Sequence, residues 1–148
     1  MTTVQTAPLL KSVVVKRPVE DAFALFTKRM GSWWPADTHS VGREKVTGVV
    51  FETRLDGRVY ETTSDGEEYD WGRVLVWEPP RRFVMSWQPS PDSPASTEVE
   101  VRFTSEGAHT RVELEHRDWE RLGALVAEVR ANYDTGWDVV LAQLVAAV

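Results

Sequence analysis

Two segments in the second half of the chain alternate strictly between apolar and polar residues. Residues 98–104 and 110–116 carry valine, leucine or phenylalanine at alternate positions, with glutamate or arginine between them. A repeat of two is typical of a strand with one buried face and one solvated face. The apolar positions predicted to face inward are Val99, Val101, Phe103, Val112 and Leu114.

Five earlier segments also have the composition of strands, because β-branched and aromatic residues are frequent in them. They cover residues 11–17, 45–52, 58–62, 70–78 and 83–88. Asp56-Gly57 and Asp65-Gly66 frame the third segment, and such pairs favour tight turns. Pro79-Pro80 ends the fourth, since proline donates no ladder hydrogen bond.

The strand predicted over residues 70–78 carries apolar groups on both of its sides. Its orientation is therefore ambiguous, and the facing of Trp71 and Trp77 stays open. We predict that Val74 and Val76 face inward and that Arg73 faces outward. In the next strand, Phe83, Met85 and Trp87 are expected beside the inward valines.

Two further segments show helical periodicity. Residues 19–27 follow Pro18, a residue that suits a helix start, and their apolar positions have i, i+3, i+4, i+7 spacing. Residues 120–148 carry an apolar stripe in steps of three and four, which predicts one long C-terminal helix. Gly136 interrupts this helix at a cost of about 1 kcal/mol relative to alanine. We expect close approach of the helix to the sheet to be its reason.

The order of these elements predicts an α+β fold. One strand is followed by short helices, six more strands and the long helix, so that the sheet is antiparallel with about 6–7 strands. The 148 residues fit a single domain, with residues 1–8 frayed. Residues 88–96 contain three prolines and are expected to form an extended connector.

Composition excludes several functions. The chain has no cysteine, which removes disulfides, thiol nucleophiles and cysteine-bound metals. The 17 basic and 23 acidic side chains give a net charge of −6, which argues against nucleic-acid or anionic-membrane binding. The sequence has neither a signal peptide nor an apolar run long enough to span a membrane. We therefore expect a cytoplasmic protein.

Tryptophan is the most informative residue type, with seven copies in the chain. Each supplies a large flat surface and one N–H donor, so tryptophans serve either core packing or an aromatic binding pocket. Trp33-Trp34 lies between Gly31 and Pro35, where a helix must break. This pair is the best candidate for a flexible gate.

Titratable residues give few catalytic candidates. His116 falls on the inward phase of its strand, and His39 follows the Trp-Trp-Pro segment, where it would line an entrance. Glu61 and Glu78 would act as acid or base only if buried beside a second polar group. The three histidines lack metal-binding spacing, and the sequence predicts no metal site and no cofactor.

Taken together, the residues resemble a known family. The sequence is similar to the START-like, or SRPBCC, superfamily with its helix-grip fold, and more narrowly to bacterial homologues of the activator of heat-shock-protein-90 ATPase. The resemblance covers residues 11–144. The stretches that carry it are Gly31-Ser32-Trp33-Trp34-Pro35, Val59-Tyr60-Glu61, Trp71-Gly72-Arg73-Val74, Trp77-Glu78-Pro79-Pro80, Ser96-Thr97-Glu98-Val99, Glu115-His116 and Gly136-Trp137.

The resemblance implies a curved sheet wrapped around the C-terminal helix, with a ligand cavity between them. The expected cavity residues come from the short helices, the inward strand positions and the long helix. They are Trp33, Trp34, Phe83, Met85, Trp87, Val99, Val101, Phe103, Val112, Leu114, His116, Tyr133, Trp137 and Val140.

Three functions follow, in this order. The first is binding of a small apolar or aromatic molecule in the cavity. The second is an enzyme, a cyclase or hydrolase using the same cavity. The third is a cochaperone-like interaction with a chaperone. An exposed aromatic patch would also favour a homodimer, a state that the sequence does not fix.

Overall fold

Seven antiparallel strands form one curved sheet in the computed structural model, which describes residues 6–88 and 95–148. The strands run in the spatial order β1-β7-β6-β5-β4-β3-β2. Their bounds are Leu9–Val15 for β1, Val46–Phe51 for β2, Arg58–Thr63 for β3, Glu68–Glu78 for β4, Arg82–Trp87 for β5, Thr97–Glu106 for β6 and His109–Arg117 for β7. The predicted α+β class and strand count are confirmed.

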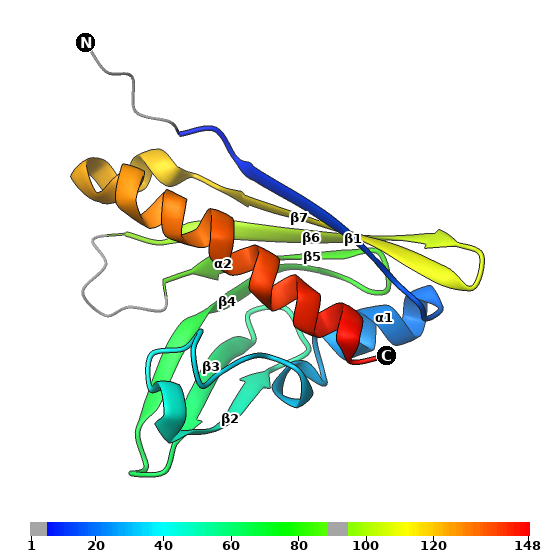
Figure 1. Cartoon of the computed structure of the whole chain (residues 1–148), viewed down its shortest axis with the longest axis horizontal. Coiled ribbons are helices and arrows are strands. Elements are labelled where there is room, and N and C mark those ends of the chain that lie inside the picture. Colours follow the sequence, from blue (N-terminus) through cyan, green and yellow to red (C-terminus); the bar gives the residue numbers. More distant parts are fainter. Residues whose placement is uncertain (1–5, 89–94) are drawn as a thin grey trace.

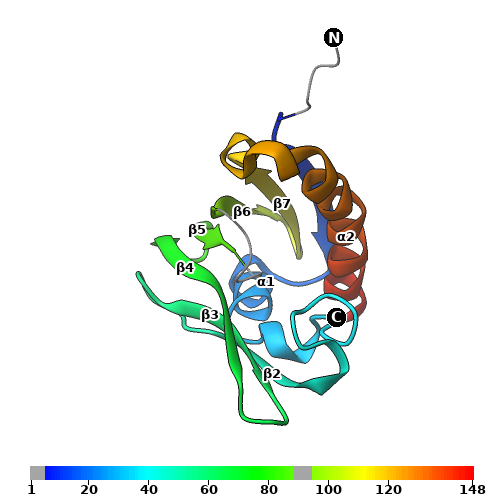
Figure 2. The ribbon, with the colours of Figure 1, turned by 90° about the vertical axis from the view of Figure 1, so that its left-hand side faces the viewer.

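Helices occupy the concave side of the sheet. Helix α1 (Val19–Phe26) follows β1, and the short helices η1 (Met30–Ser32) and η2 (Arg43–Lys45) precede β2. Helix α2 (Val126–Ala146) runs diagonally across the molecule (Figure 1). Figure 2 shows the sheet curving round α1 while α2 closes the open side, which is the helix-grip arrangement.

The C-terminal helix differs from the prediction in one respect. Residues 120–148 do not form a single helix, because Gly123 adopts φ 59° and ψ −125°, outside the helical region. The chain therefore forms η3 (Trp119–Leu125), bends at this glycine, and begins α2 at Val126. Only glycine adopts such angles without strain.

Strand β4 explains why its orientation was ambiguous. Trp71 and Val74 are 1% exposed and Trp77 packs against the core, so inward residues recur every third position instead of every second. The register of β4 shifts once against β3 and once against β5, and each irregularity adds a residue to the strand. The prediction holds for Val74 and for Arg73, which is exposed, and is wrong for Val76, because Trp77 faces the core instead.

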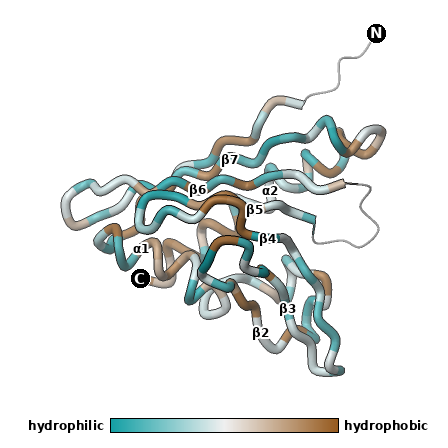
Figure 3. The backbone as a smooth tube through the Cα atoms, turned by 180° about the vertical axis from the view of Figure 1, so that it is seen from behind, coloured by the Kyte–Doolittle hydropathy of each residue, from teal (hydrophilic) through white to brown (hydrophobic). Residues whose placement is uncertain are grey.

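The core fills the space between the central strands and α1. Hydrophilic and hydrophobic segments alternate along β6 and β7 (Figure 3), and the predicted inward positions of both strands are at most 5% exposed. Phe83 and Phe103 pack against Phe23 and Phe26 of α1, with ring centroids 4.9–6.1 Å apart. This part of the concave face is therefore solid.

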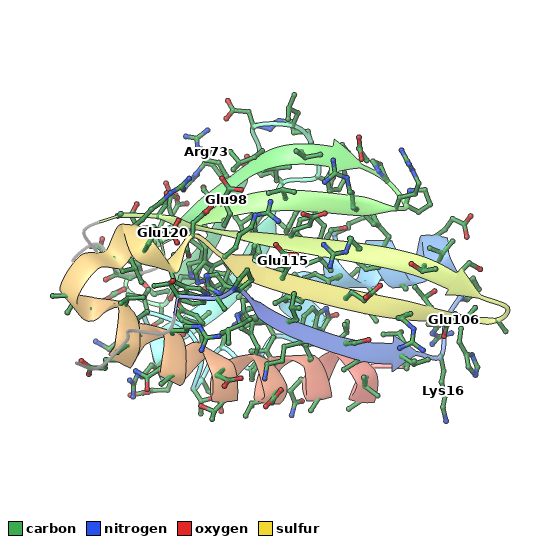
Figure 4. The ribbon with its side chains drawn as sticks, turned by 90° about the horizontal axis from the view of Figure 1, so that it is seen from above. Lys16, Arg73, Glu98, Glu106, Glu115 and Glu120 are labelled. Atoms are coloured by element: carbon green, nitrogen blue, oxygen red, sulfur yellow. The ribbon has the colours of Figure 1, made fainter. Side chains whose placement is uncertain are left out.

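The outer face of the sheet carries a charged network. Glu98 and Glu115 lie on the upper face of β6 and β7 (Figure 4). Arg117 contacts both of them and also Glu100, whose Oε1 lies 2.6 Å from the guanidinium. The arginines of this face therefore have carboxylate partners within the protein.

The predicted connector at residues 88–96 and the predicted frayed start fall largely outside the described residues. Gln88 donates its backbone N–H to the carbonyl of Trp71 at 2.6 Å. Near the N-terminus, Arg130 of α2 donates a hydrogen bond to the carbonyl of Ala7 at 2.8 Å. Ala7 is therefore attached to α2.

Candidate functional site

A pocket of about 670 Å³ lies where α2 faces the loop between η1 and η2. One tryptophan of β4 and one of β5 line the pocket, and residues of α2 form the side opposite the loop. The aromatic lining consists of Trp34, Trp71, Trp87, Tyr133 and Trp137. Four indoles thus meet in one cavity.

Trp34 is at the centre of this aromatic cluster. Its ring centroid lies 4.9 Å from that of Trp71, 6.1 Å from that of Trp87 and 5.9 Å from that of Trp137. The Trp34 and Trp137 rings are perpendicular. Tilted and edge-on pairs of this kind are favourable, so the indoles hold one another in place.

The four indole N–H groups all donate to the protein itself. Trp34 donates to the carbonyl of His39 at 2.8 Å, and Trp71 donates to Oε1 of Glu61 at 2.7 Å. Trp87 donates to the Tyr133 hydroxyl at 2.8 Å, and Trp137 donates to the His116 ring at 3.0 Å. With their single donors used, these indoles, which are 1–7% exposed, present no polar group to the pocket.

His116 is an internal anchor behind the pocket. It is fully buried, and its Nδ1 accepts the hydrogen bond from Trp137, so the proton of the ring sits on Nε2. Nε2 lies 2.6 Å from the Thr97 hydroxyl. Burial lowers the pKa of His116 to about 3, which keeps the ring neutral at physiological pH. His116 therefore orients Trp137 and does not line the pocket.

Glu61 holds the loop that forms the outer wall. Its side chain is fully buried and accepts the backbone N–H groups of Val41 and Gly42, each at 2.7 Å, besides the Trp71 indole. A side chain at position 42 would meet the Glu61 carboxylate at 3.0 Å and Thr63 at 2.7 Å, so glycine is needed there. Glu61 accepts three N–H donors and does not line the pocket, so the acid–base role considered for it lacks contact with a ligand there.

Polar groups surround the mouth of the pocket. His39 comes from the loop, Arg43 begins η2, and Asn132 and Thr135 come from α2. The His39 ring approaches α2 at Gly136, where an added Cβ would lie 3.8 Å from Cδ2 of the histidine. Gly136 therefore faces the loop at the mouth of the pocket, and the expected close approach to the sheet is wrong.

Tyr133 supplies a polar group inside the aromatic wall. Its hydroxyl oxygen accepts the Trp87 hydrogen bond, which leaves the hydroxyl proton available to a ligand. Burial raises the pKa of Tyr133, against an opposing effect of the Trp87 hydrogen bond. The hydroxyl therefore keeps its proton at neutral pH and acts as a neutral donor.

The structure divides the predicted cavity residues into two groups. Five of them line the pocket: Trp34, Trp87, Tyr133, Trp137 and Val140. The others lie behind it, in the packed core: Trp33, Phe83, Met85, Val99, Val101, Phe103, Val112, Leu114 and His116. Trp33 donates its indole N–H to the carbonyl of Leu25 at 2.7 Å, on the α1 side. Whether Trp33-Trp34 acts as a gate stays a prediction.

His39 was expected at an entrance, and it does line the pocket. Several other lining residues were not predicted from the sequence. Trp71 was left open because β4 carries apolar groups on both sides. Val129 belongs to the apolar stripe of α2 but was not named as a cavity residue. The others lie between η1 and β2, where the sequence shows no periodicity, or beside the apolar stripe of α2: Thr38, Ser40, Val41, Arg43, Asn132, Thr135, Gly136 and Val139.

Within residues 6–88 and 95–148, no group of three or more His, Asp or Glu side chains is arranged to hold a metal ion. No helix of the same residues is long and apolar enough to cross a membrane.

The fold and the sequence together decide the family. Residues 16–148 match the family model described as activator of Hsp90 ATPase homolog 1-like protein. The chain belongs to this family. The resemblance to the SRPBCC superfamily is thereby confirmed, and no curated protein matches the sequence.

Solved structures of similar proteins share the fold. The anthrahydroquino-γ-pyrone synthase Txn09, complexed with SUM, is 38% identical over 86% of this chain and 87% of its own, with a TM-score of 0.61. CalC from Micromonospora echinospora, a self-sacrificing resistance protein, is 29% identical over 95% and 93%, with a TM-score of 0.69. The Aha1 dimer from Colwellia psychrerythraea is 17% identical over 96% of both chains, with a TM-score of 0.66. At this identity the similarity shows only a common fold.

Proposed function

We propose that this protein binds a planar aromatic small molecule in the pocket between α2 and the loop at residues 34–43. The observation that carries the proposal is the set of four indoles whose N–H groups are all bonded internally. Such a wall gains free energy from stacking and from burial of apolar surface, and it demands no hydrogen bond from the ligand. A flat aromatic molecule fits these requirements best.

The size and composition of the pocket support this proposal. Small-molecule sites have volumes of roughly 300–1,000 Å³ and combine apolar walls with a few polar groups. At about 670 Å³, with Tyr133 inside and polar side chains at the mouth, this pocket has both features. The residues proposed to contact the ligand are Trp34, Trp71, Trp87, Tyr133, Trp137 and Val140.

The relatives support the same class of ligand. Txn09 is described as an anthrahydroquino-γ-pyrone synthase, and it is 38% identical to this chain over 87% of its own length. A fused aromatic ring system is compatible with the aromatic lining of the pocket. A chaperone partner and a homodimer stay predictions, because the Aha1 dimer is too distant to carry more than the fold.

An enzyme acting on the same ligand is the second candidate. The named synthase activity of Txn09 favours it, and Tyr133 supplies a hydroxyl proton in the aromatic wall. Tyr133 would then donate a hydrogen bond to a ligand oxygen, with its basicity lowered by the Trp87 indole. Liquid chromatography and mass spectrometry of the compound after incubation separate the two candidates. Only an enzyme would change the mass or the retention time of the compound.

The test of binding uses anthraquinone-2-carboxamide, a neutral planar probe, and tryptophan fluorescence. We expect saturable quenching in the unmodified protein. Gly136→Phe places a ring in the mouth of the pocket and should abolish quenching, whereas Gln143→Phe, on an exposed position of the same helix, should leave it unchanged. Equal binding by both variants, or no binding by the unmodified protein, would contradict the proposed function.

A further inference from the structure

The wall of the pocket has a charge opposite to that of the protein. The whole chain carries a net charge of −6, yet none of the described residues lining the pocket is aspartate or glutamate. The single formally charged side chain among them is Arg43. Glu61, bonded to three N–H groups, lies behind the loop and outside this lining.

Arg43 has no partner among the described residues. The arginines of β3 to β7 pair with carboxylates: Arg58 with Asp70 at 2.6 Å, for example, and Arg117 with Glu100 at 2.6 Å. Besides Arg43, only Arg17 lacks a hydrogen bond or ion pair of its guanidinium within residues 6–88 and 95–148, and Arg17 lies away from this pocket. An unpaired guanidinium at a pocket mouth is available to an incoming anion.

The backbone holds Arg43 in place at this position. The residue adopts φ 50°, a conformation that costs free energy for any side chain with a Cβ. Its N–H donates to the Ser40 hydroxyl at 2.8 Å, and the Ser40 hydroxyl in turn donates to the carbonyl of Ala36. The adjacent Gly42 N–H is bonded to Glu61. These hydrogen bonds fix the backbone at Arg43.

From these observations we infer that the ligand carries an ionised acidic group, a carboxylate or phenolate on its aromatic ring, which Arg43 recognises at the mouth of the pocket. The inference rests on the proposed function, since it assigns chemistry to the ligand of that same pocket. The planar guanidinium donates two parallel hydrogen bonds to the two oxygens of a carboxylate, or two N–H groups to the single oxygen of a phenolate, while the ring lies against the indoles. Asn132 of α2 supplies a neutral donor from the other wall.

The test compares anthraquinone-2-carboxylate with anthraquinone-2-carboxamide, which differ in charge and share the ring system. We expect the carboxylate to bind the unmodified protein about tenfold more tightly, as hydrogen bonds to charged groups allow. Raised salt should reduce this preference, because ions screen a charge pair at the surface. Affinities come from titrations of tryptophan fluorescence and from calorimetry.

Two arginine variants make the test specific. Arg43→Gln should bring the carboxylate-to-amide ratio to about one while the affinity for the amide changes less than twofold. Arg17→Gln, the matched control, should keep the tenfold ratio. Thermal unfolding of both variants verifies that they are folded.

The outcomes separate the two proposals. Equal affinity of both probes for the unmodified protein, or a ratio that survives Arg43→Gln, overturns the role of Arg43 and leaves the proposed function standing. Failure of both probes to bind overturns the proposed function and this inference with it.

Discussion

The indole Nε1 of Trp137 donates a hydrogen bond to Nδ1 of His116 across 3.0 Å. This contact joins α2 to β7 and requires an unprotonated Nδ1, because indole nitrogen is a donor only. His116 also stacks on Trp119, with ring centroids 4.0 Å apart. A histidine at the inward phase of its strand thus connects two helical segments to the sheet.

The first prediction concerns the pH dependence of stability. The pKa of His116 is about 3 in the folded protein, while an unfolded histidine titrates near 6.5. Between these values the unfolded state binds one more proton, so the contribution of His116 is complete above about pH 6.5 and is lost as the pH falls. We expect the free energy of unfolding to decline by about 1.4 kcal/mol per pH unit below pH 6 from this group.

His116→Gln tests the assignment, because glutamine does not titrate. Urea unfolding of both proteins at pH 5 to 7 should show a steeper decline in the unmodified protein, by about one proton. Similar slopes in the two proteins would show that His116 titrates normally and that the buried arrangement is absent. His109→Gln, at the exposed first residue of β7, should keep the full slope.

The second prediction concerns the loop that forms the outer wall of the pocket. In Glu61→Gln one acceptor oxygen becomes an NH₂ group, so one of the three N–H donors loses its partner. An unsatisfied buried donor costs about 1–3 kcal/mol. Hydrogen exchange at the amides of Val41 and Gly42 should accelerate by tenfold or more, and the affinity for pocket ligands should fall.

Glu44→Gln is the matched control for this loop. Glu44 is exposed and makes no side-chain hydrogen bond within the described residues, so exchange at Val41 and Gly42 should remain at the unmodified rate. Unchanged exchange in Glu61→Gln would mean that other contacts hold the loop.

The alternation of residues along the chain was enough to predict the sheet. Val99, Val101 and Phe103 face inward as expected, since burying one face of a strand leaves a strict repeat of two. The same rule failed in β4, where two irregularities change the repeat and bring Trp77 inward instead of Val76. Bulges depend on packing between residues far apart in the chain, so the local sequence does not predict them.

The pocket was only partly predictable for a related reason. Its helical side follows the apolar stripe of α2, which identified Tyr133, Trp137 and Val140. Its loop side depends on contacts between residues about 20 positions apart, such as Glu61 with Val41 and Gly42. The apolar repeat in steps of three and four also continues past Gly123. The sequence pattern therefore did not reveal the bend before α2.

The third prediction concerns Tyr133 as the acceptor for Trp87. Tyr133→Phe removes the oxygen that accepts the indole N–H at 2.8 Å. The buried donor is then unsatisfied, and we expect the protein to lose about 1–3 kcal/mol of unfolding free energy in urea. Tyr60→Phe is the control, because the ring of Tyr60 packs under Arg58 and its hydroxyl makes no hydrogen bond within the described residues. Equal losses in the two variants would contradict the assigned role of Tyr133.

The fourth prediction contrasts two glycines. In β4, a Cβ at Gly72 would lie 1.7 Å from the backbone oxygen of Ser86, so Gly72→Ala must push β4 and β5 apart. We expect a loss of about 3 kcal/mol or more. In α2, a Cβ at Gly136 would lie 3.8 Å from the His39 ring, an ordinary contact, so Gly136→Ala should stabilise the helix by up to about 1 kcal/mol. Thermal and urea unfolding of the two variants measure both signs. A Gly136→Ala protein less stable than the parent would show that α2 and the loop lie closer together than in the structure. A Gly72→Ala protein as stable as the parent would contradict the close contact between β4 and β5.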